Sequence, residues 1–101
     1  MSTPLTKLVD AAEFAREDIA ATTTKNLPPD LDGRNGDRSS WAAAALVAYR
    51  VETGSDLEDA VSDLVGDLAH WCDRHGFDFE LAIDRARGHY QAETRGKGAQ
   101  L

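Results

Sequence analysis

The sequence predicts an all-α protein, a small helical bundle of three to four helices that we expect to be dimeric. Apolar residues recur at helical spacing in several segments, and residues that favour helix ends separate these segments. No segment shows the alternating pattern of a strand. The length of 101 residues suits one domain. We expect a single helical domain over 1–101, with an amphipathic helix at 5–21, a loop at 22–38, a helical core at 39–95 and a disordered tail at 96–101.

Composition places the chain among soluble proteins. Hydrophobic residues make up 42% and charged residues 29%, and no apolar run approaches the length of a membrane span. The first residues lack a basic region followed by an apolar stretch, so they do not resemble a signal peptide. The single cysteine, Cys72, excludes an internal disulfide and fits a reducing compartment. We therefore expect a cytoplasmic protein without a membrane partner.

The negative charge is concentrated in the middle of the chain. The net charge is −7, and residues 39–76 contribute −5 of it, from 2 basic and 7 acidic residues. A protein that binds the phosphate backbone needs a basic stripe, which this sequence lacks. We expect no direct contact with nucleic acid. The acidic middle suits divalent-cation binding, nucleic-acid mimicry or solubility.

The first helix and the loop have contrasting compositions. From Leu5 to about Ala21, apolar residues recur at helical spacing with acids between them. The following segment contains Pro28, Pro29, two glycines and several Asp and Asn residues, which favour turns. Such a long connection in a compact domain is either functional or mobile.

The second helix is apolar nearly all round. Ser39 or Ser40 can cap it, and it extends to Gly54 as WAAAALVAYRVET. A helix of this kind is buried on more than one side. It is either a central core helix, or a core helix that also forms a homodimer interface because the chain is too small to bury it alone. For the second case we expect the interface residues to be Trp41, Ala44, Ala45 and Trp71.

The third and fourth helices have clear boundaries. Ser55 and Glu58 have the spacing of a capping box, and Gly76 suits the end of the third helix. Asp78 suits the cap of the fourth helix. Cys72 is expected to be a small buried hydrophobic residue. The apolar stripe of the third helix comprises Leu57, Val61, Leu64, Val65, Leu68 and Cys72; that of the fourth comprises Phe79, Ala82, Ile83, Ala86 and Tyr90.

Two carboxylates on the third helix are candidate metal ligands. Asp63 and Asp67 lie one helical turn apart beside the apolar stripe, and Asp67 is expected to be partly buried. Carboxylates in this arrangement can hold Mg²⁺, which prefers oxygen ligands. The alternative is a solvated acidic helix face, which the composition favours. His89 and Glu93, also one turn apart, are expected to form an ion pair or hydrogen bond within the fourth helix.

Residues 63–93, DLVGDLAHWCDRHGFDFELAIDRARGHYQAE, resemble small helical proteins of bacteriophages and actinobacterial genomes, many of which have no assigned function. The stretch also resembles the second half of MazG-like all-α nucleoside triphosphate pyrophosphohydrolases. Val65 to Leu68 match L-G-D-L of that family, and Gly76 to Asp78 match G-I-D. The resemblance implies Mg²⁺ coordination through Asp67. Leu64 replaces the glutamate of the family's E-x-x-D motif, and the second helix lacks the acids of its E-E-x-x-E motif.

These departures favour a non-catalytic, phage- or prophage-type accessory protein that acts through protein–protein interaction. Its expected partners are a second copy of itself and a host or phage protein. We assign no catalytic and no cofactor-binding residues, and this function requires no cofactor. The alternative is a MazG-like, Mg²⁺-dependent nucleotide pyrophosphohydrolase with Asp63 and Asp67 as metal ligands.

Overall fold

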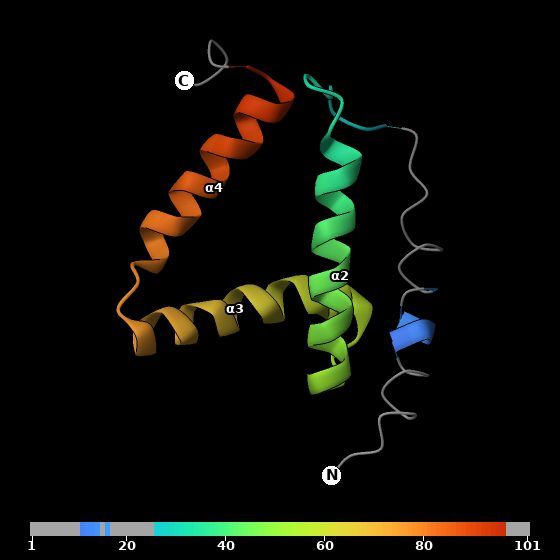
Figure 1. The fold of residues 1–101 in the computed structure, drawn as a ribbon. Helices are drawn as coiled ribbons and strands as arrows, with labels where there is room; N and C mark the ends of the chain where they lie inside the picture. The colour runs from blue at the N-terminus through green and yellow to red at the C-terminus, as the bar shows by residue number, and fades with distance from the viewer. Residues whose placement is uncertain (1–10, 15, 17–25, 97–101) are drawn as a thin grey trace.

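The computed structural model describes residues 11–14, 16 and 26–96, and this part of the chain contains helices and no strand (Figure 1). The predicted all-α class is confirmed. None of the described helices combines the length and apolar character that crossing a bilayer requires. A short helical segment at residues 11–14 precedes three long helices, which are α2 (Asn35–Thr53), α3 (Leu57–His75) and α4 (Phe79–Thr94). Most of the predicted 5–21 helix and the tail after Gly96 lie outside the described residues.

The three long helices outline a three-sided frame (Figure 1). The C-terminal part of α2 crosses the N-terminal part of α3, and α4 turns back from the far end of α3 toward the start of α2. Each helix therefore packs mainly at its ends. A frame of this kind covers less helix surface than a side-by-side bundle would.

Helix α2 begins at Asn35, about one turn earlier than the predicted Ser39 or Ser40. The preceding loop supplies the reason. The Asp30 Oδ1 atom accepts a hydrogen bond from the Asn35 backbone N–H at 3.2 Å, so a loop side chain satisfies one of the unpaired N–H groups at the helix start. The predicted loop at 22–38 therefore ends at residue 34.

The start of α3 also differs from the prediction, whereas its end and the start of α4 agree with it. Asp56, not Ser55, occupies the N-cap position, and the Ser55 hydroxyl donates to Asp63 at 2.6 Å. Gly76 ends α3 in the left-handed conformation, with φ of 74°. Asp78 caps α4 by accepting a hydrogen bond from the Leu81 N–H at 2.9 Å.

The core of the described part is small. Its buried apolar residues are Ala60, which is 0% exposed, and Cys72, as expected for a small buried hydrophobic residue. The prediction that α2 is a core helix buried on more than one side is wrong, because Arg50 is the one buried residue in this helix. Trp41, in the N-terminal half of α2, is exposed.

Candidate protein interface

Asp63 and Asp67, the candidate metal ligands, both accept hydrogen bonds from hydroxyl groups at the α2–α3 junction. The Tyr49 hydroxyl donates to Asp67 Oδ2, and the Ser55 hydroxyl donates to Asp63 Oδ2. Donating this bond to Asp67 raises the pKa of Tyr49 to about 12, because the nearby carboxylate disfavours the phenolate. Asp67 is exposed rather than partly buried as expected. Asp67 thus joins α3 to α2, whereas Asp63 bonds the short connection between the two helices.

Magnesium is commonly held by one or two carboxylates, with waters or substrate phosphates as its other ligands. In the described part of the chain, no group of three or more His, Cys, Asp and Glu side chains could hold a metal ion. The acids that approach α2 are paired with hydroxyls rather than with further acids. The geometry therefore adds no ligand to the pair that the sequence suggested.

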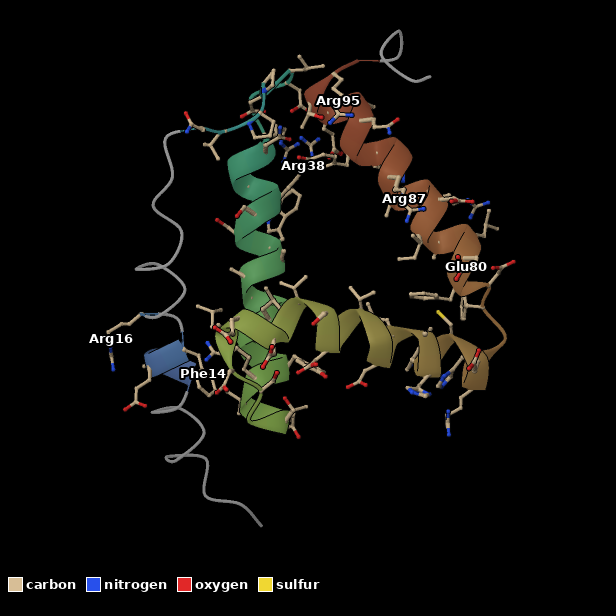
Figure 2. The ribbon with its side chains drawn as sticks, turned by 180° about the vertical axis from the view of Figure 1, so that it is seen from behind. Phe14, Arg16, Arg38, Glu80, Arg87 and Arg95 are labelled. Atoms are coloured by element: carbon tan, nitrogen blue, oxygen red, sulfur yellow. The ribbon has the colours of Figure 1, made fainter. Side chains whose placement is uncertain are left out.

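Arg50 is the most deeply placed charged residue at the same junction. It is 3% exposed, and its Nε donates to the Ser55 carbonyl at 3.0 Å. The Phe14 ring lies over the guanidinium, 4.0 Å from its central carbon (Figure 2). Arg50 was not among the residues for which a role was predicted, although an arginine within an otherwise apolar run indicates a specific contact. We call Tyr49, Arg50, Ser55, Asp63 and Asp67 the pinned junction.

One exposed side of α2 carries an apolar stripe. Its residues follow the spacing i, i+3, i+4, i+7, so they share one face of the helix. All are exposed, and Trp41 is 60% exposed. The Arg34 guanidinium lies over the Trp41 ring, with its central carbon 5.6 Å from the ring centroid. Among the described contacts, this is the one that brings a charged group to the stripe. The α2 stripe consists of Trp41, Ala44, Ala45 and Ala48, and so includes three of the four predicted interface residues.

The fourth predicted interface residue, Trp71, lies in the C-terminal part of α3. Its ring stacks on His75 at a centroid distance of 4.3 Å and on Phe77 at 5.2 Å. Trp71 is nevertheless 47% exposed and Phe77 is 61% exposed. The structure does not bring Trp71 and Trp41 together, because they lie on different helices at different corners of the frame.

An apolar groove opens beside Trp71. Its volume is about 450 Å³, and it lies between the C-terminal half of α3 and the N-terminal half of α4. The charged residues among its lining are Asp78 and Arg85. We call it the elbow groove, and its other lining residues are Leu68, Trp71, Cys72, Phe77, Phe79, Leu81, Ala82, Ile83 and Ala86.

Large apolar side chains are exposed on all three long helices and in the turn between α3 and α4. They include Trp41 on α2, Val61 and Leu68 on α3, Phe77 in the turn and Leu81 on α4.

A polar corner closes the frame opposite α3. Arg38 on α2 binds Asp32 through two hydrogen bonds, of 2.8 and 2.7 Å, and Glu93 on α4 at 3.1 Å (Figure 2). The guanidinium holds the pKa of Asp32 well below its usual range. The Glu93 carboxylate thus pairs with Arg38, where the sequence had suggested His89. These contacts fix the end of α4 while its apolar groove stays open.

Comparisons with known proteins add no evidence on the fold or on the interface. No family model matches the chain, and no curated protein and no solved structure is similar enough to count as a match. The resemblances to small phage proteins and to MazG-like enzymes therefore rest on the sequence alone.

Proposed function

We propose that this protein is a non-catalytic accessory protein, of the phage or prophage type that its sequence resembles, and that it acts by binding other protein chains. One observation carries the proposal: the α2 stripe and the elbow groove leave large apolar side chains exposed on a chain with two small buried apolar residues in its described part. Contiguous apolar surface on a soluble protein is typical of a protein interface.

The first partner we propose is a second copy of the chain, bound through the α2 stripe. The alanines allow two helix backbones to approach closely, and Trp41 supplies the large apolar area that dominates many interfaces. A stripe of this kind can pair with itself about a two-fold axis. A host or phage protein is the proposed second partner, for which the exposed acids Glu58, Asp59 and Asp73 of α3 offer charge.

The substitution Ala44→Glu tests this proposal. It places a charge at the centre of the α2 stripe, and burying that charge without a partner would weaken association by at least about a hundredfold. Sedimentation velocity over a range of chain concentrations measures the effect. Ala42→Glu is the matched control, because Ala42 is also exposed on α2 but lies on another side of the helix.

Two results would contradict the proposal. One is a folded wild type that stays monomeric at every concentration and binds no protein partner. The other is release of pyrophosphate from nucleoside triphosphates in the presence of Mg²⁺, abolished by Asp67→Asn, which would favour the MazG-like alternative.

A further inference from the structure

We infer that the elbow groove is a second contact between copies of this chain, separate from the α2 stripe. The inference rests on the proposed function and assigns a partner to the surface that the α2 stripe leaves open. The two surfaces share no residue, and they lie at different corners of the frame.

The elbow groove exposes more large apolar side chains than the α2 stripe does. Trp71, Phe77 and Leu81 line the groove and are 47%, 61% and 44% exposed. The α2 stripe contains one large side chain and three alanines. Burial of the α2 stripe alone would therefore leave the larger of the two apolar surfaces in water.

The charges of the groove fit a second copy better than a basic protein. Its rim carries one acid, Asp78, and one base, Arg85. A two-fold axis through the groove would place the acid of each copy near the base of the other. Asp63 and Asp67 do not line the groove, so the net charge of −7 is not concentrated where the two copies would meet. A basic partner would find one carboxylate there.

Trp71 provides a suitable anchor for this contact. Stacking on His75 and Phe77 holds its ring in one orientation while nearly half of its surface stays exposed. A side chain that is already fixed loses little conformational entropy on binding. Tryptophan is also among the residues that contribute most to binding free energy at interfaces.

The substitution Leu81→Glu tests the inference on the full chain. Leu81 lines the groove and is 44% exposed. It lies in the first turn of α4, where a glutamate interacts favourably with the helix dipole, so the variant should fold. Removing a two-fold contact should halve the mass of the wild-type species and weaken association at least about a hundredfold. Ala92→Glu, an exposed position of α4 outside the groove, should leave the mass unchanged.

Fluorescence supplies a second measurement. The chain contains two tryptophans, so Trp41→Phe leaves Trp71 as the single reporter. The Trp71 emission should move to longer wavelength when this variant is diluted, because the ring becomes solvated as the copies separate. With Leu81→Glu added, the emission should stay at the long wavelength at every concentration, while circular dichroism shows that the helices are intact.

The outcomes separate the inference from the proposed function. If Leu81→Glu halves the wild-type mass while Ala92→Glu keeps it, and the Trp71 emission shifts on dilution, the inference is supported. If Leu81→Glu keeps the wild-type mass while Ala44→Glu loses it, the inference is overturned and the proposed function stands. A monomeric wild type whose Trp71 emission changes only with another protein would assign the groove to that protein and also overturn the inference.

Discussion

The two ends of α3 are held in different ways. At its N-terminal end, the pinned junction joins α3 to α2 through specific polar contacts, with Ala60 fully buried and Arg50 nearly so. At its C-terminal end, the turn to α4 holds stacked aromatic rings and an open apolar groove. One end is closed within the chain, whereas the other leaves apolar surface exposed.

The contacts that set the shape of the chain are therefore not the contacts expected to contribute most to its stability. Hydroxyl–carboxylate and arginine–carbonyl bonds have strict geometry, so they can fix the angle between α2 and α3 with little buried area. Burial of apolar area is the larger stabilising contribution in most proteins. On our proposal, the elbow groove obtains that burial on assembly, so stability should rise with chain concentration.

The largest effect within a single chain is expected for Arg50→Ala. The change removes the bond to the Ser55 carbonyl and the contact with Phe14, and it leaves space at a position that is 3% exposed. A hydrogen bond from a charged group contributes about 1.5–3 kcal/mol, and the arginine stem adds packing. We expect the free energy of unfolding to fall by about 2–4 kcal/mol in urea titrations at fixed chain concentration.

Arg87→Ala is the control for Arg50→Ala. Arg87 is largely exposed, with its ion pair to Asp84 at 3.5 Å, and such pairs contribute about 0–1 kcal/mol. Equal losses for the two variants would show that the pinned junction is no more important than a solvated surface pair. The contrast between the two ends of α3 would then lose its energetic basis.

The features that the sequence predicted are those set by neighbouring residues. Gly76 ends α3 because it adopts a left-handed conformation at little cost, and Asp78 caps α4 with its own side chain. Local chemistry decides each of these, so no knowledge of the tertiary arrangement is needed.

The features that the sequence did not predict depend on how the helices cross. Ser55 fits a capping box by spacing, yet its hydroxyl bonds Asp63 because the turn brings the two together. The pairing of Tyr49 with Asp67 requires the angle between α2 and α3. The apolar run of α2 suggested a core helix, but a frame of three helices does not cover its second side. The hydropathy of a sequence identifies an apolar helix face, but it does not show whether the same chain covers that face.

Substitution of Gly76 should sharpen the comparison at the elbow. Gly76 has φ of 74°, and a Cβ there would meet no atom within 4 Å, so the cost of Gly76→Ala is conformational. We expect a loss of about 1–2 kcal/mol in the free energy of unfolding. Gly66→Ala is the matched control in the same helix, also with open space around the added Cβ, and it should stabilise the chain by about 0.5–1 kcal/mol.

A gain in stability from Gly76→Ala would mean that the elbow tolerates another backbone conformation, and the groove would then not be preformed. Urea titration of both glycine variants at one chain concentration decides this. Sedimentation of Gly76→Ala adds a second reading, because a misdirected α4 should also weaken association through the elbow groove.

The smallest effect is expected for Tyr49→Phe, and its pH dependence identifies the cause. The carboxylate of Asp67 raises the pKa of Tyr49 in the folded chain from about 10 to about 12. The folded state therefore holds the phenolic proton more tightly than the unfolded state. The resulting stabilisation is fully present below about pH 10 and is lost as the pH rises through about 12.

Wild type should thus lose stability relative to Tyr49→Phe across this interval. Asp67→Asn, which removes the carboxylate that raises the pKa of Tyr49, should lose the same pH dependence in urea titrations over this range. If Tyr49→Phe runs parallel to wild type, the bond to Asp67 contributes nothing to the α2–α3 angle, and that angle must come from Arg50 and the burial of Ala60.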